Sequence, residues 1–392
     1  MVYLDHAATT EVRPEVVADV TAELGALGNP SSLHGHGRAA RRTVEEARER
    51  LAVALGSTPH EVVFTGGGTE ANNIAIKGLY WARNAADARR SRILTSAVEH
   101  HAALDPAHWM AEHQGAVHEK VPVDALGRVT PEALREAIEG GSGPGTVALV
   151  SVMWANNEVG TVQPTEELAA VAAEYGIPFH TDAVQAVGVE PVDFAASGAG
   201  ALTVSGHKLG GPVGAGALLV ARGLTPVPVL HGGGQERDIR SGTLASPLLR
   251  GLATAVHLAV AEREEHAKHL TALRDELEER VRAAVPDVVV NGAPEHRLPG
   301  ISHMSFPGCE GDALLMLLDA RGISCSTGSA CSAGVAQPSH VLLEMGADPE
   351  DALSSLRLSL GRTSTREDVA ALAEAIGPAV ERARAARAKR RW

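Results

Sequence analysis

The chain has 392 residues, 44% of them hydrophobic and 21% charged, with a formal net charge of −13. This length suggests two domains, or one large domain with an attachment, and the acidic balance argues against nucleic acid as the main partner. No apolar run approaches the roughly 18 residues of a membrane span, so we expect no membrane partner.

Residues 1–5 have neither the basic nor the apolar region of a signal peptide. The three cysteines, Cys309, Cys325 and Cys331, are too few for a disulfide framework in a chain of this size. We therefore expect a protein of the cytoplasm. No spacing typical of metal ligands is found, and no metal site is expected.

The first 260 residues alternate strand-like and helix-like patterns, which is typical of an α/β sheet. Apolar residues recur at helical spacing between 38 and 55, and Thr130 before Pro131 marks the start of another helix. Runs such as VALVSVM are typical of strands buried on both faces, so we expect a largely parallel sheet. Strands are predicted at 61–65, 92–95, 146–153, 177–181 and 201–205.

The pattern changes near residue 246. We expect one long helix over 246–285, strongly charged in its second half, that leads into a smaller part of the chain. That smaller part has strand patterns at 301–306 and 355–360, and helical patterns at 311–321 and 365–388.

A glycine turn, Gly66-Gly67-Gly68 followed by Thr69, lies between a predicted strand and a predicted helix. Glycines let the backbone approach an anion, and the start of a helix offers free N–H groups and a positive dipole end. The turn is neither a dinucleotide fingerprint nor a P-loop, so a phosphate site and a simple tight turn are equally good interpretations.

Asp182 and Lys208 each come at the end of a predicted strand, where ligands bind in open α/β sheets. Only five of the 35 basic residues are lysines, and Lys208 is in an apolar context with no other charge between Asp193 and Arg222. Lost hydration there would lower its pKa toward a nucleophilic range. A phosphate cradle, a lysine and an acid are together what pyridoxal 5'-phosphate needs.

At this point the sequence resembles the cysteine desulfurases of the IscS/NifS type, class V aminotransferase-like enzymes of fold-type I, over essentially the whole chain. The motifs that carry the resemblance stand in order along the chain and include YLDHAATT, FTGGGTEANNIAIKG, VEHHAALD, NNEVGTVQP, HTDAVQAVG, SGHKLGGPVGAGAL, HGGGQERDIRSGT, STGSACSAG and SLRLSLGR. The resemblance implies a large cofactor-binding domain over 14–261 and a small α+β domain formed by 1–13 and 262–392, which carries a cysteine loop.

The same resemblance implies a role for each matching residue. Lys208 holds pyridoxal 5'-phosphate covalently, Cys331 is the nucleophile, and His100 stacks on the cofactor ring and shuttles protons. A homodimer is implied as well, because the threonine of RSGT completes the phosphate site of the other subunit. The residues implied in binding are Gly68, Thr69, Ser205, His207 and Thr243 for the phosphate, Asp182 and Gln185 for the ring, Asn157 for cofactor and substrate, and Arg357 for the substrate carboxylate.

Cys331 also has a local interpretation, because it lies in a stretch of small residues with little to anchor it in a core. We expect an exposed loop there, whereas Cys325 and Cys309 are expected to be structural. The implied reaction converts L-cysteine to L-alanine, leaves sulfur on Cys331 as a persulfide, and passes it to an acceptor protein of iron–sulfur cluster assembly or tRNA thiolation. The acceptor is left open.

Other functions are weighed beside this one. A selenocysteine lyase or an aminotransferase would share the fold, and Cys331 is the feature that favours desulfuration, since transamination needs no thiol. A metal or iron–sulfur carrier based on Cys325 and Cys331 would leave the pairing of Asp182 with Lys208 unexplained. The arginine-rich stretch 382–391 is interpreted as a solvated helix end, and no direct nucleic-acid contact is expected.

Overall fold

The computed structural model describes residues 1–328 and 337–390. Its largest sheet has seven strands. Five neighbouring strands, β7, β6, β5, β3 and β4, are mutually parallel, as expected. The strand β8 runs antiparallel to both of its neighbours, which the sequence pattern did not reveal. The order across the sheet is β2 (Val62–Thr65), β8 (Gly216–Val220), β7 (Ala201–Ser205), β6 (Phe179–Asp182), β5 (Val147–Ser151), β3 (Arg92–Ser96) and β4 (Val117–Val121).

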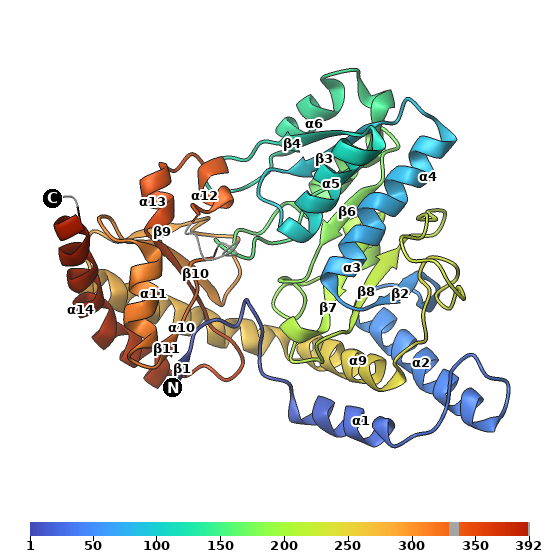
Figure 1. Ribbon diagram of the computed structural model, residues 1–392, viewed down its shortest axis with the longest axis horizontal. Coiled ribbons are helices and arrows are strands. Elements are labelled where there is room, and N and C mark those ends of the chain that lie inside the picture. The colour runs from blue at the N-terminus through green and yellow to red at the C-terminus, as the bar shows by residue number, and fades with distance from the viewer. Residues whose placement is uncertain (329–336, 391–392) are drawn as a thin grey trace.

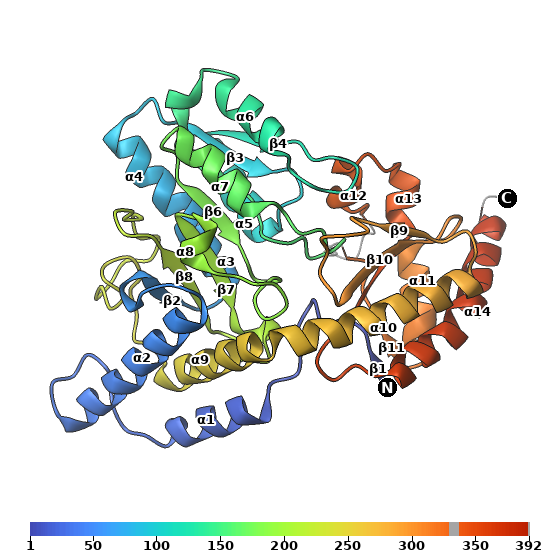
Figure 2. The same ribbon diagram turned by 180° about the vertical axis from the view of Figure 1, so that it is seen from behind.

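Helices cover both faces of this sheet. One face carries α3 (Gly68–Asn73), α4 (Leu79–Ala86) and α5 (His101–Gln114), which lie in front of the sheet in Figure 1. The opposite face carries α7 (Thr165–Glu174) and α8 (Phe194–Ser197), in front in Figure 2. Around them lie α1 (Pro14–Leu24), α2 (Gly35–Ala54), α6 (Pro131–Glu139) and α9 (Ser246–Ala261).

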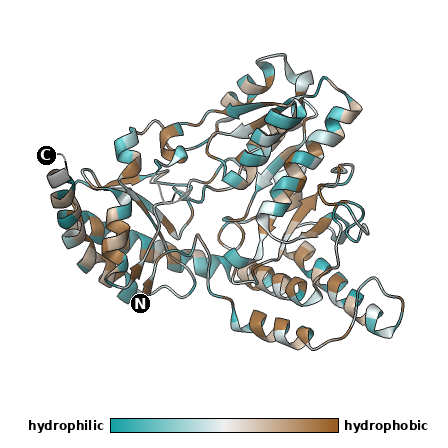
Figure 3. Ribbon diagram, viewed as in Figure 1, coloured by the Kyte–Doolittle hydropathy of each residue, from teal (hydrophilic) through white to brown (hydrophobic). Residues whose placement is uncertain are grey.

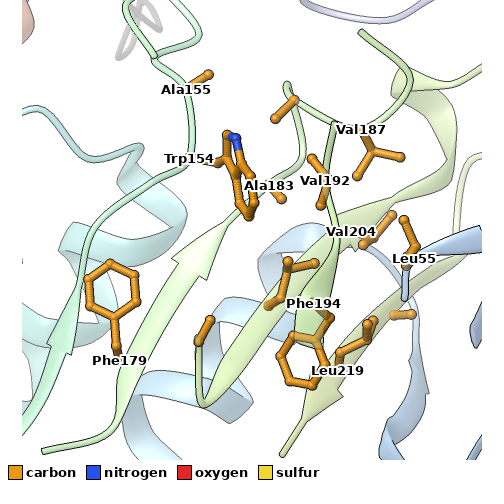
Figure 4. Packing of buried hydrophobic residues seen from close by; sticks show 14 of the residues in the cluster. Leu55, Trp154, Ala155, Phe179, Ala183, Val187, Val192, Phe194, Val204 and Leu219 are labelled. Atoms are coloured by element: carbon orange, nitrogen blue, oxygen red, sulfur yellow. The ribbon is translucent and has the colours of Figure 1, made fainter. Parts of the chain in front are cut away.

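Every strand of this sheet except the edge strand β4 is buried on both faces, and apolar residues of these strands form its core. Phe179, Val204 and Leu219 pack with Phe194 and Leu55 from neighbouring helical segments (Figure 4). The hydropathy colouring in Figure 3 shows hydrophobic residues in strands of this sheet and many hydrophilic residues on the helices around it.

The second part of the chain has its own small sheet and its own core. Its antiparallel sheet has the order β12 (Ser355–Ser359), β10 (Ile301–Ser305) and β9 (Val289–Asn291), while β1 (Val2–Tyr3) pairs in parallel with β11 (Ile323–Ser324). Leu4, Leu273, Phe306, Leu358 and Ile376 belong to this second core. The helices are α10 (Arg263–Ala284), α11 (Gly311–Asp319), α12 (His340–Glu344), α13 (Pro349–Leu353) and α14 (Arg366–Arg390).

The prediction of a single helix over 246–285 is wrong, because the structure has two helices there. Glu262, with φ −93° and ψ −1°, ends α9 and precedes α10. Its carboxylate accepts a hydrogen bond from Arg13 Nη1 at 2.7 Å, a partner from the start of the chain that local periodicity cannot reveal. Leu270, Leu273, Leu277 and Val281 of α10 belong to the second core, and Figure 2 shows α10 running from α9 toward the small sheet. Among the described helices, none is long and apolar enough to cross a bilayer.

Candidate active site

The candidate site lies at the edge of the large sheet where β2, β6 and β7 end. Asp182 is the last residue of β6, and a 3₁₀ turn, Gly206–Lys208, follows directly after β7. The glycine turn 66–68 follows β2 and leads into α3. Ligands bind at this edge of an open α/β sheet, because the loops there are free to carry binding groups. The structure thus brings together three segments that are far apart in sequence.

One end of the site presents hydrogen-bond donors. Gly67 has φ +147°, a conformation that side chains rarely allow, and it precedes the N-terminus of α3 at Gly68. The Thr69 hydroxyl, Ser205 and His207 line the same cavity. Burial and the neighbouring Lys208 lower the pKa of His207 to about 4, so this imidazole is neutral at physiological pH.

Asp182 lies buried at the other end of the site. Its Oδ2 accepts a hydrogen bond from Asn72 Nδ2 at 2.6 Å, and its Oδ1 accepts one from the backbone N–H of Val184 at 2.9 Å. Two donors on one carboxylate fix its orientation. This end of the site therefore presents a negative charge in a protected position.

The Lys208 amine lies between these two ends. Its Nζ donates to the backbone oxygens of Ala7 at 2.5 Å and Ala8 at 2.8 Å. Burial, followed by the positive charge of Arg357, lowers the pKa of Lys208 to about 8, although Asp182 opposes the shift. The low pKa expected from the apolar context is confirmed, and its main cause is the expected loss of hydration.

His100 and Gln185 complete the wall around the lysine. His100 is the N-cap of α5, and its Nδ1 accepts a hydrogen bond from the Ala102 N–H at 3.0 Å, which leaves the proton of a neutral ring on Nε2. Although part of this ring is exposed, burial lowers its pKa, with Asp182 opposing. The side-chain amide of Gln185 donates to the Ala7 oxygen at 2.9 Å.

Arg357 enters the site from the small sheet. Its Nη2 donates to Asp5 Oδ1 at 2.8 Å and its Nη1 to the backbone oxygen of Asn157 at 3.0 Å. Its Nε is buried, and among the described residues it has no hydrogen-bond partner. The guanidinium is thus held by two contacts and has a donor left over.

These groups line one cavity, which encloses about 1060 Å³ including space open to solvent. Ser326 and Gly328 also line it, directly before the segment that contains Cys331. Cys331 itself lies outside the described residues. Thr243 is exposed and does not line this cavity in the single chain. The predicted residues that do line it are Gly68, Thr69, His100, Asn157, Asp182, Gln185, Ser205, His207, Lys208 and Arg357.

Two groups of functional contacts were not expected from the sequence. Asn72, the partner of Asp182, follows Gly68 by four residues, so helical spacing from the glycine turn could have pointed to it. For the contacts of Asp5, Ala7 and Ala8, the only signal in the sequence was the YLDHAATT motif, because these contacts join residues about 200 or more positions apart.

Both remaining cysteines are withdrawn from solvent to some degree. Cys309 is fully buried in the second core. Cys325 is partly buried, and burial raises the pKa of its thiol to about 12. Neither thiol is an available nucleophile near neutral pH, which fits the structural roles expected for them.

Comparisons with known proteins agree with this geometry. The family model described as "Aminotransferase class-V" matches residues 2–372. The chain is 57% identical to the "IscS-like cysteine desulfurase" of Mycobacterium tuberculosis, with 98% of each chain covered. The chain belongs to the class-V aminotransferase family, among its cysteine desulfurases.

Further members support the same placement within the family. The "Cysteine desulfurase IscS" of Methanosarcina thermophila is 43% identical and covers 98% of this chain and 93% of its own. A solved structure named "NIFS-LIKE PROTEIN" superposes with a TM-score of 0.89 at 34% identity, with 97% of this chain and 99% of that chain covered. The fold-type I architecture inferred from the sequence is confirmed.

Membership of the class-V family implies pyridoxal 5'-phosphate as cofactor, and the residues of the cavity fit this group. The donors around Thr69, Ser205 and His207 have the chemistry of a phosphate site. Asp182 offers an oriented carboxylate for a pyridine nitrogen, and Lys208 is a partly buried amine with a lowered pKa. Phosphate donors, amine and acid are therefore present in one cavity.

Proposed function

We propose that this protein is a pyridoxal 5'-phosphate-dependent cysteine desulfurase that converts L-cysteine to L-alanine and keeps the sulfur on Cys331 as a persulfide. The observation that carries the proposal is the position of Lys208, a partly buried amine with a pKa of about 8 in the same cavity as Asp182 and a set of phosphate donors. An aminotransferase would use the same groups, and Cys331 is what favours desulfuration.

When bound, pyridoxal 5'-phosphate supplies a ring that accepts electrons from the α-carbon of an amino acid. The phosphate would be held by Thr69, the backbone at Gly68, Ser205 and His207. Asp182 would hold a proton at the pyridine nitrogen, and Gln185 would reach the hydroxyl of the ring. Neutral His207 binds as a hydrogen-bond donor rather than as an ion.

Lys208 takes the α-proton of the substrate. Its pKa of about 8 leaves far more free amine near neutral pH than an ordinary lysine has, so it can act as a base. The Ala7 and Ala8 oxygens orient the amine. His100 carries its proton on Nε2, and we assign it the stacking on the ring and the delivery of protons.

Arg357, together with Asn157, binds the substrate carboxylate. Arg357 lines the cavity, while Asp5 and the Asn157 oxygen keep its guanidinium from rotating. A fixed arginine aligns the α-carbon with the base, and such alignment is a large part of catalysis.

Cys331 attacks the substrate sulfur as a thiolate, which breaks the bond between carbon and sulfur. The persulfide that forms is then passed to an acceptor protein, and iron–sulfur scaffolds and tRNA-thiolating enzymes are the acceptors we propose. We also propose that the enzyme is a cytoplasmic homodimer, with Thr243 of each copy reaching the phosphate site of the other. The low cysteine content is what supports the reducing compartment.

The test of this function follows sulfur from radiolabelled L-cysteine onto the protein. Cys331→Ser replaces a soft nucleophile by a hydroxyl that is un-ionised at neutral pH, so label should no longer appear on the chain. Cofactor content should stay normal, because Cys331 has no part in the phosphate, ring or lysine contacts.

The matched controls are Cys325→Ser and Cys309→Ser, which should both keep the label. Label lost with Cys325→Ser and kept with Cys331→Ser would place the nucleophile six residues earlier and contradict the proposal. 3-Mercaptopyruvate formed in place of L-alanine, with no label on the protein, would instead indicate an aminotransferase, which leaves the bond between carbon and sulfur intact.

A further inference from the structure

The surface segment 231–243 has a strained backbone at two non-glycine residues. His231 and Thr243 at its two ends are exposed. Within it, Arg237 with φ +52° and Asp238 with φ +58° adopt the left-handed conformation that non-glycine residues rarely occupy. Such strain persists only where surrounding contacts over-determine the backbone, and it is concentrated at functional sites.

A buried ion pair fixes the middle of this segment. The Glu236 carboxylate is fully buried and meets Arg48 through two hydrogen bonds, with Nη2 to Oε1 at 2.6 Å and Nη1 to Oε2 at 2.8 Å. Its Oε2 also accepts the N–H of Phe64 in β2 at 2.9 Å. Buried ion pairs add little net stability because their desolvation is costly, but they favour one geometry.

A second ion pair ties the segment to the glycine turn of the site. Arg240 Nε donates to Glu70 Oε1 at 2.9 Å, and Glu70 Oε2 accepts the N–H of Gly66 at 2.5 Å. Glu70 directly follows Thr69 in α3. The segment is therefore fixed to the same turn that supplies the phosphate donors.

The end of the segment has no partner in its own chain's cavity. The Gln235 side chain accepts the N–H of Gly242 at 2.8 Å, which orients the backbone just before Thr243. Thr243 is exposed, and so is Thr69 at the phosphate end of the cavity. Within the described residues, one copy thus offers an exposed threonine that does not line its own cavity, and a phosphate end open to solvent.

We propose that Glu236 is a positioning residue that acts between subunits, because it holds segment 231–243 in the conformation in which Thr243 meets the phosphate end of a second copy's cavity. This rests on the homodimer and the role of Thr243 given under Proposed function. The carboxylate of one chain then governs how firmly the other chain retains its cofactor.

Mixed dimers of two differently tagged chains test this. The readout is the dissociation constant of pyridoxal 5'-phosphate, measured by equilibrium dialysis. In the Glu236→Gln homodimer both sites receive a weakened segment, and we expect the cofactor to bind roughly tenfold more weakly, as when groups that support a binding site are removed. Glu119→Gln is the matched control, since Glu119 binds Arg92 through two hydrogen bonds in β4, at the opposite edge of the sheet from β2.

The decisive species pairs a Glu236→Gln chain with a Lys208→Ala chain. Only the site of the Glu236→Gln chain has an intact Lys208, and the segment that reaches this site comes from the Lys208→Ala chain, whose Glu236 is unchanged. The cofactor should therefore bind there as tightly as in a dimer of wild-type and Lys208→Ala chains. If Glu236 instead acts on the site of its own chain, the mixed dimer should bind the cofactor as weakly as the Glu236→Gln homodimer does. That result, or a protein that forms no dimer, would overturn the proposal.

A second variant protects the test against a folding defect. If Glu236→Gln chains do not fold, Glu236→Asp takes their place in the same pairing, since it keeps the charge opposite Arg48 but is too short to keep every contact of the carboxylate, and the two outcomes keep their meaning. Failure of the proposed function would be seen separately, as a wild-type homodimer that binds the cofactor but forms no L-alanine from L-cysteine.

Discussion

Lys208 is held by the Ala7 and Ala8 oxygens from the far end of the chain, and this gives the site its base. We expect Lys208→Ala to abolish the formation of L-alanine from L-cysteine and the covalent attachment of the cofactor, because no other lysine lines the cavity. Both can be measured on the purified variant. Lys268→Ala, an exposed lysine of α10, is the control and should behave as wild type. Normal alanine production by Lys208→Ala would contradict the assigned role.

The lowered pKa of Lys208 also predicts how stability depends on pH. The unfolded chain keeps the ordinary lysine pKa of 10.5, whereas the folded chain has about 8. Between these values the unfolded state binds more protons, so this group makes the free energy of unfolding rise with pH, and below about 8 its unfavourable contribution is constant.

Lys208→Met removes that contribution. Without cofactor at pH 7, the variant should be more stable than wild type by at most about 3 kcal/mol. The difference should shrink as the pH rises through 8 to 10.5. Urea unfolding of both proteins across this range measures it, and a difference that grew with pH would show the sign to be wrong.

Among the helices, α6 has a start signal that the sequence predicted and the structure confirms. Thr130 is its N-cap, and the Thr130 hydroxyl accepts the N–H of Ala133 at 3.1 Å. Thr130→Ala should lower the free energy of unfolding by about 1 kcal/mol and leave cofactor binding unchanged.

Thr43→Ala is the matched control for this cap. Thr43 lies inside α2, where alanine is the better helix former, so the same substitution should be neutral or slightly stabilising there. Chemical denaturation of both variants compares them, and equal losses at the two positions would show that the cap contributes nothing.

Elements could be predicted where the local pattern is strong. The apolar runs that became β5 and β7 are buried on both faces, and their strand positions were right to within a few residues. The edge strand β4, with the sequence VHEKV, was missed because only its last residue is buried. The break at Glu262 was missed because its partner, Arg13, is brought there only by the tertiary fold. A division between large and small domains near residue 261 stays our proposal.

The site could be predicted in part for a physical reason. Asp182, Lys208 and the glycine turn each follow a strand, and the ends of parallel strands meet at one edge, so their convergence could be inferred. The finer roles of His100, Gln185 and Arg357 came from the resemblance to a family. The carbonyls of Ala7 and Ala8 have no local signal, since any residue presents a backbone oxygen.

At the scale of the whole molecule, we expect two copies to form one functional unit. Light scattering of the purified enzyme should give about twice 40.7 kDa, because the proposed role of Thr243 requires a second chain at each phosphate site. Loss of activity on dilution, in step with loss of the dimer, would support this. A fully active species of 40.7 kDa would contradict it.

The pairing of β1 with β11 has a consequence for synthesis on the ribosome. Val2 pairs with Ile323, and Asp5 binds Arg357. The N-terminal strand therefore cannot pair until residues more than 300 positions later have been translated. Until those residues emerge, β7 and the turn that carries Lys208 can form, but residues 5–8 have no small sheet to hold them in place. Domains of long chains form in order as they emerge, and here the catalytic amine gains its fixed surroundings only near the end of translation. A nascent chain therefore passes most of its synthesis without a formed active site.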